Sequence, residues 1–196
     1  DYDEWITTYT DPKPDRYHSG RKAGQLSQAG IILTLMLRSL IEHGEYNEVD
    51  FCRRMDEELF PFVDGTPMGG PGGYTSQSIR EAWRRRVEQK LPWGQTGGHA
   101  DDTEAIERIL ALAVRYAFQP AELATAVANN TRLTQVDDTV ISMTVAYAAV
   151  LGLLVQGHAF DKALSGNLMK LVKTGKLPFH AVTFADLQPP RPGDPD

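Results

Sequence analysis

The sequence has one cysteine, no excess of positive charge and no strong alternation of polar and apolar residues. Its single cysteine, Cys52, excludes an intrachain disulfide framework and a zinc site built from several cysteines. Because Cys52 stands within a helical pattern, we interpret it as a buried apolar side chain and not as a nucleophile. The net charge of -6 argues against a nucleic-acid-binding protein, which normally carries a basic surplus.

A long apolar run is missing as well. The most apolar stretch, Val140–Val155, is shorter than the roughly 20 residues that a membrane-spanning helix needs, and it contains Ser142, Thr144 and Tyr147. We therefore interpret it as a core helix and expect no membrane partner. Since no signal peptide is visible and cysteine is scarce, the cytoplasm is the expected location.

Helical periodicity is what the sequence does contain. Apolar residues recur at helical spacing along most of the chain, which predicts an all-α fold. Ser27 and Asn47 are expected to cap the first two helices, and Gly44 is expected to end the first. Residues 179–187 are compatible with a further helical turn or with a strand. The expected helices span residues 25–43, 48–59, 76–90, 102–117, 120–129, 138–156 and 161–173.

The length of the chain fits one all-helical domain over residues 1–196. Residues 1–22 mix prolines, aromatic residues and charges without periodicity, so we expect an irregular segment there, and the proline-rich residues 188–196 are expected to form a flexible tail. The chain does not begin with methionine, and we expect the domain to be incomplete at both ends. The helices around 26–41 and 140–155 are apolar on nearly every side, which favours either a homo-oligomer or a complementary segment that covers them.

The tripeptide Asp-Asp-Thr occurs twice, each time directly before a long apolar helix pattern. The first copy starts at Asp101 and the second at Asp137. Neighbouring carboxylates suit a hard cation such as Mg²⁺, but they also suit the first turn of a helix. Both interpretations stay open from the tripeptide alone.

At the first copy, Glu104 follows Asp101 by three residues, which is the spacing of a capping box. This pattern predicts Asp101 as the N-cap of a helix that begins at Asp102. The preceding Gly-Gly-His at 97–99 favours another interpretation, because glycines let the backbone approach an anionic group such as a diphosphate closely. Either aspartate could then recruit a cation that bridges the protein and the phosphate.

At the second copy, Val140 stands where the first copy has a glutamate. Asp137 is the expected N-cap, and Asp138 is expected to interact with the helix dipole. Thr134 is an alternative cap. A structural role therefore accounts for this copy.

Two other features are interpreted as structural. The segment Gly69–Gly73 lacks both the following Lys-Ser or Lys-Thr and the preceding strand of a phosphate loop, so it is predicted to be a flexible connection. None of the five histidines has a partner at the spacing of a zinc site on a helix. Only His99 stands beside a carboxylate pair.

Three blocks of the sequence point to a known family: YHSGRKAGQLSQAG, GGHADDTEAIERILALAVRYAFQPAEL and VANNTRLTQVDDTVISMTVAYAAVL. Their order and spacing resemble the ADP-ribosylglycohydrolases over roughly Tyr17 to Gly157, and most closely a divergent branch with the jellyfish J-crystallins and selenoprotein J. The resemblance implies a compact orthogonal multi-helix bundle that binds Mg²⁺ and hydrolyses N- or O-glycosidic bonds to ADP-ribose. The implied partner is a small-molecule or ADP-ribosylated substrate.

The resemblance also indicates where a site would lie. The family's first metal motif, which is T-D-D-T-like, aligns with the residues around Leu26–Ala29, where no carboxylate stands. The GGHADD stretch matches the Gly/Ser-rich loop that lines the family's ADP-ribose pocket, and Thr134-Gln135 replaces a Thr-His pair. The implied catalytic residues are Asp101 and Asp102, the implied substrate-binding residues are Gly97, Gly98, His99, Ser27 and Gln28, and the weak candidates for a metal are Asp101, Asp102 and Asp138.

Two functions are consistent with these observations. The first is an ADP-ribosylglycohydrolase-like protein that hydrolyses or binds an ADP-ribosyl or related nucleotide-glycosidic group. The second is a non-catalytic, crystallin-like descendant that serves as a structural or ligand-binding protein. The absence of the T-D-D-T carboxylates favours the second function, because Mg²⁺ would lack half of its expected ligands.

Overall fold

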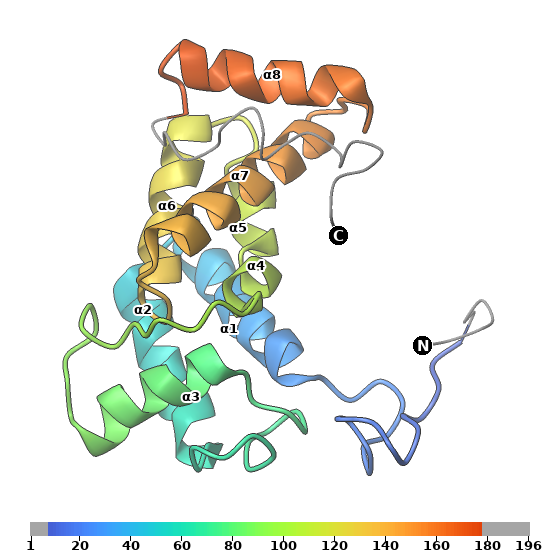
Figure 1. Ribbon diagram of the computed structural model, residues 1–196, viewed down its shortest axis with the longest axis vertical. Helices are drawn as coiled ribbons and strands as arrows, with labels where there is room; N and C mark the ends of the chain where they lie inside the picture. Colours follow the sequence, from blue (N-terminus) through green and yellow to red (C-terminus); the bar gives the residue numbers. More distant parts are fainter. Residues whose placement is uncertain (1–7, 178–196) are drawn as a thin grey trace, which may run out of the picture.

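The computed structural model describes residues 8–177 and is built from helices, without a β-strand in that range. The predicted all-α class is confirmed (Figure 1). The predicted element at 179–187 and the predicted tail at 188–196 lie outside the described residues. The α-helices are α1 (Gln28–His43), α2 (Glu48–Arg54), α3 (Gln77–Trp83), α4 (Glu104–Arg108), α5 (Leu110–Arg115), α6 (Pro120–Arg132), α7 (Asp138–Val155) and α8 (Lys162–Lys173).

Two of these helices continue in a different helical geometry. A π-helical turn over Met55–Leu59 and a 3₁₀ turn over Phe60–Phe62 follow α2, and a π-helical turn over Arg84–Glu88 follows α3. The expected helices at 48–59 and 76–90 are thus present, but their hydrogen bonding changes partway along.

The first helix begins and ends at the predicted residues. The Ser27 hydroxyl accepts a hydrogen bond from the amide of Gly30 (3.2 Å), and Gly44, with φ of 73°, ends α1 by donating its amide to the carbonyl of Leu40. Asn47 caps α2 by accepting from the amide of Asp50 (2.9 Å). The sequence predicts these helix ends correctly because each of the hydrogen bonds joins residues within about one turn.

The core lies between α1 and the later helices. α1 packs against α2, α4 and α5, while α7 packs against α4, α5, α6 and α8. In Figure 1, α8 lies across the end of α7. Ile32, Met36, Leu112, Val127 and Val145 are fully buried where these helices meet.

The most apolar helix is central to this packing. By length and composition α7 could cross a membrane, but half of its residues are buried inside the fold. Its contacts with four other helices agree with its interpretation as a core helix. Cys52 is buried too, and burial raises the pKa of its thiol to about 12, so it is not a nucleophile.

One predicted helix differs in its start and its continuity. We expected a helix over 102–117, but the structure starts it at Glu104 and interrupts it at Ile109, whose ψ of -1° departs from helical geometry. The N-cap residue is Thr103, which makes no capping hydrogen bond through its side chain. The capping box predicted for Asp101 is therefore wrong, and the reason lies in contacts that distant residues make with this loop.

Candidate active-site cleft

A cleft of ≈ 290 Å³ opens where the beginning of α1 meets the beginnings of α3 and α4. It has hydroxyl, amide, aromatic and carboxylate groups on its walls. The residues that line it are His18, Ser27, Gln28, Ala29, Tyr74, Ser76, Asp102, Thr103, Glu104 and Glu107.

The wall formed by α1 is polar but carries no carboxylate. Ser27 is the cap of the helix, and the buried Gln28 accepts a hydrogen bond from the amide of Ser76 through its Oε1 atom (2.8 Å). Gln28 therefore holds the segment that precedes α3. This wall contains the positions where the resemblance placed the family's first metal motif.

The glycine-rich segment packs tightly against this wall. A Cβ atom on Gly72 would lie 2.0 Å from the backbone nitrogen of Gln28, and the φ of Gly72 is 93°. Its carbonyl oxygen lies 3.0 Å from Nδ1 of His18, and the ring of Tyr17 lies 5.0 Å from that of Tyr74. Glycine is required here because any side chain would push the segment off the start of α1.

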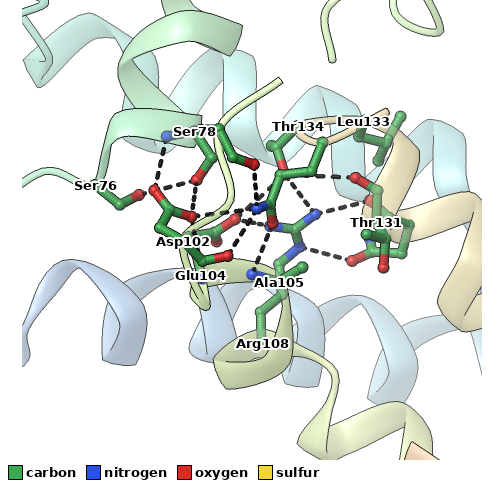
Figure 2. A network of polar contacts seen from close by, with 12 residues as sticks. Ser76, Ser78, Asp102, Glu104, Ala105, Arg108, Thr131, Leu133 and Thr134 are labelled. Atoms are coloured by element: carbon green, nitrogen blue, oxygen red, sulfur yellow. Dashed lines mark hydrogen bonds and ion pairs between the residues drawn. The ribbon is translucent and has the colours of Figure 1, made fainter. Parts of the chain in front are cut away.

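Asp102 joins three separate parts of the chain (Figure 2). Its carboxylate accepts from the Ser78 amide (2.9 Å) and from the Ser78 hydroxyl (2.7 Å) at the start of α3. Gln135, which is fully buried, donates to the Asp102 carbonyl (2.8 Å) and to its carboxylate (3.3 Å). Because both carboxylate oxygens are engaged, this geometry favours a positioning role for Asp102.

Glu104 points into the protein interior and forms a buried ion pair with Arg108. The Arg108 guanidinium also donates to the Asn130 side chain (2.7 Å), to the Asn130 carbonyl (2.8 Å) and to the Thr134 hydroxyl (3.0 Å), as Figure 2 shows. Only Oε2 of Glu104 takes part in this pair, and Oε1 has no hydrogen-bond partner among the described residues. This arrangement explains why Glu104 does not reach back to Asp101.

Glu107 lines the same cleft, three residues further along α4. Partial burial raises the pKa of its carboxyl, and the negative charges of Glu104 and Asp102 raise it further. No ion pair to Glu107 occurs within residues 8–177. The α4 side of the cleft therefore concentrates negative charge.

The predicted site residues do not all meet at this cleft. Ser27, Gln28 and Asp102 line it together, while His99 and Asp101 are exposed in the loop before α4, outside its lining. Their predicted ligand and metal roles stay predictions.

Gly97 and Gly98 are buried in the same loop, again outside the lining. Gly98 pairs with the α6–α7 connection, donating its amide to the Thr134 carbonyl (2.9 Å) and accepting from the Val136 amide (2.9 Å). A Cβ atom on Gly97 would lie 2.4 Å from the backbone oxygen of Arg132. Packing of the chain therefore accounts for this glycine without a ligand.

The sequence reasoning missed Glu104 and Glu107 as site residues. Their spacing of three residues was a visible signal, because such residues share one face of a helix. Tyr74 and Ser76 carried no comparable signal, since they reach the cleft only through the packing of their segment on α1.

The comparison with family models settles which family this architecture represents. The model of the ADP-ribosylglycohydrolase family matches residues 2–188. The chain belongs to the ADP-ribosylglycohydrolase family. Searches of curated proteins and of solved structures found no match.

ADP-ribosylglycohydrolases are typically metal-dependent, and the described part of this chain has one acidic group whose ligand atoms lie within 4.8 Å of one another. It consists of Glu42, His43 and Asp50, at the far end of α1 from the cleft. Arg54 donates to Asp50 (2.7 Å) and pairs with Glu42, and Arg53 donates to Asp50 (2.5 Å). Two guanidinium groups thus already supply the positive charge that a metal ion would bring.

The electrostatics of that group agree with its pairing. Burial alone would raise the pKa of Asp50, but the hydrogen bonds from Arg54 and Arg53 outweigh it and hold the pKa below its ordinary value. The cleft differs, because no ion pair to its Glu107 occurs among the described residues. Oxygen donors of this kind fit a hard divalent cation.

Proposed function

We propose that this ADP-ribosylglycohydrolase family member hydrolyses the N- or O-glycosidic bond of an ADP-ribosyl or related nucleotide-glycosidic group in the cleft. The observation that carries the proposal is that three acidic residues, Asp102, Glu104 and Glu107, line one cleft. The family supports the substrate class, and the carboxylates supply the chemistry that such a bond requires.

Glycosidic cleavage passes through a centre with the character of an oxocarbenium ion, which is positively charged. Fixed negative charge near that centre stabilises the transition state more than the neutral ground state. Arg108 holds one oxygen of Glu104, so the orientation of this carboxylate is fixed. Asp102 fixes the loop before α4 to Ser78 and so holds the wall in place.

A divalent cation, when bound, would orient phosphate and ribose oxygens and offset their negative charge. Glu107, which lines the cleft without an ion pair among the described residues, is the carboxylate that would hold it. Ser27 and Gln28 contribute polar groups from α1 that can hydrogen-bond to the substrate.

A non-catalytic protein of the J-crystallin type is the second candidate. It is favoured by the α1 wall, which carries no carboxylate, and by Asp102, whose carboxylate oxygens are both engaged with protein groups. Such a protein would keep the fold and bind a nucleotide without turnover.

The test measures ADP-ribose binding by calorimetry and release of ADP-ribose from N- and O-linked ADP-ribosylated peptides. We expect binding and turnover, and a loss of turnover of roughly 10²-fold in Glu107→Gln, because removing one preorganised electrostatic group commonly has that effect. Glu122→Gln, an exposed glutamate on α6, is the matched control. Binding without turnover would support the non-catalytic candidate, and neither binding nor turnover would refute both.

A further inference from the structure

We propose that the outward face of α8 binds the surface of a membrane rich in anionic lipid, through its lysines and the neighbouring Phe160. The expectation of no membrane partner rests on the lack of a spanning helix in the sequence, and binding to the surface of a bilayer needs none. The proposed contact is separate from the cleft and does not depend on hydrolysis there.

The first argument is the row of lysines along α8. The spacings of eight and three residues between Lys162, Lys170 and Lys173 bring them within roughly a quarter turn of one another around the helix. Lys176 is held beside the last turn, where its amide donates to the Leu171 carbonyl (3.0 Å). All four lysines are exposed, and no ion pair to any of them occurs within residues 8–177.

The opposite side of α8 is fixed in the fold. Leu164 and Leu168 are buried, and the helix packs against α7. Asp161 caps the first turn by accepting from the amide of Ala163 (2.8 Å), so the one carboxylate beside this helix has a local role. The packing therefore holds α8 with its lysine side toward solvent.

The second argument is the uneven distribution of charge along the chain. Residues 139–177 contain four lysines and a single acidic residue, Asp161, although the whole chain has a net charge of -6. In Figure 1, α8 lies at the opposite end of the molecule from α3. Attraction to an anionic surface would turn the α8 end toward it and leave the cleft, beside the beginning of α3, open to solvent.

The third argument separates a bilayer from other anionic partners. Phe160 stands two residues before Lys162 and is 82% exposed. An anionic bilayer offers negatively charged headgroups to lysines and, just below them, an apolar layer to an aromatic ring. A nucleic-acid duplex offers its phosphates to the lysines but no such layer to the ring. The combination of lysines and Phe160 therefore favours lipid.

The experiment measures cosedimentation of the full chain with sucrose-loaded vesicles. One set contains equal amounts of phosphatidylserine and phosphatidylcholine, and the other contains phosphatidylcholine alone. We expect binding to the anionic vesicles that weakens as the salt concentration rises, because salt screens the attraction between lysines and headgroups. We expect little binding to the neutral vesicles.

The main variant combines Lys162→Gln, Lys170→Gln and Lys173→Gln. A lysine near an anionic membrane strengthens binding about fivefold, so the triple variant should bind roughly a hundredfold more weakly. The matched control removes the same charge from the N-terminal segment and the α3–α4 connection and should bind about as well as the unmodified chain. It combines Lys13→Gln, Lys22→Gln and Lys90→Gln.

A further variant, Phe160→Ser, tests the choice of a bilayer. It should weaken binding to the anionic vesicles roughly tenfold, because an aromatic ring no longer enters the apolar layer, and leave any binding to a duplex oligonucleotide unchanged. All of the substituted side chains are exposed, so the variants should keep their fold, which circular dichroism would verify.

Four results would overturn the proposal. They are absence of binding to the anionic vesicles, an equal loss in the matched control, an unchanged affinity of Phe160→Ser, and tighter binding to the oligonucleotide than to the vesicles. None of these measurements involves a nucleotide substrate, so the result is independent of whether the cleft hydrolyses one.

Discussion

The two Asp-Asp-Thr segments are identical in sequence and different in structure. At the second copy, Asp137 caps its own helix by accepting from the amides of Thr139 (2.9 Å) and Val140 (3.1 Å), as predicted. At the first copy, the second aspartate, Asp102, makes the contacts, and its main partner is Ser78 at the start of another helix. One copy acts within its own turn, while the other joins separate parts of the fold.

The residues that follow explain the difference. Glu104 follows the first copy and pairs with the buried Arg108, whereas Val140 follows the second copy and leaves its aspartate free to cap the helix. Thr144 stands four residues after Val140 and donates its hydroxyl back to the Val140 carbonyl (2.7 Å), so this turn completes its bonds locally. A tripeptide therefore takes its role from the partners that the fold presents to it.

The largest loss of stability in this comparison is expected from a substitution of Arg108, which pairs with the glutamate that follows the first copy. Arg108→Met should destabilise the protein by about 3–5 kcal/mol, because it leaves the Glu104 carboxylate buried without its charge partner. Urea denaturation followed by circular dichroism measures the change. The double variant Arg108→Met with Glu104→Met should recover much of the loss, and a double variant as unstable as the single one would contradict this account.

A smaller effect is expected at Asp102. Asp102→Ala removes acceptors for Ser78 and Gln135 and should cost about 2–3 kcal/mol, whereas the exposed Asp101→Ala should change stability by only a few tenths. A double-mutant cycle with Ser78→Ala, read from thermal unfolding, should show coupling on the order of 1 kcal/mol. Additive losses would mean that this contact does not stabilise the loop.

The smallest effect is expected at the second copy. Asp137→Ala should cost about 1 kcal/mol through the lost cap, while Asp138→Ala should cost only about 0.3–1 kcal/mol through the helix dipole. Asp137→Ser should keep most of the stability, because serine also caps helices. If Asp137→Ala were as destabilising as Asp102→Ala in the same urea titration, the contrast between the copies would fail.

Much of the fold was predictable because its signals are local. The cap at Ser27, the stop at Gly44 and the long apolar α7 follow from periodicity and from residues within one turn. The start of the helix at Glu104 was not predictable in this way. There, Glu104 could either bond back to Asp101 in a capping box or pair with Arg108. The hydrogen bonds that bury Arg108 against α6 favour the pair with Arg108.

The candidate site was predictable only in part. The resemblance placed Ser27, Gln28 and the loop around Asp102 near a ligand, and these three residues do line one cleft. It did not indicate that Asp102 would be engaged by Ser78 or that Glu107 would be free of an ion pair among the described residues. Those properties depend on residues that are distant in sequence.

By itself, the sequence determined the helices, the family and the capping of α7 by Asp137, because periodicity, motif order and first-turn chemistry act over short stretches of chain. Only the tertiary structure decided which carboxylates are available for chemistry. Asp102 meets donors from elsewhere in the fold, whereas Glu107 meets no cation among the described residues. The physical reason is that a carboxylate's charge is set by its neighbours in space, and side chains from separate helices become neighbours only when the core packs.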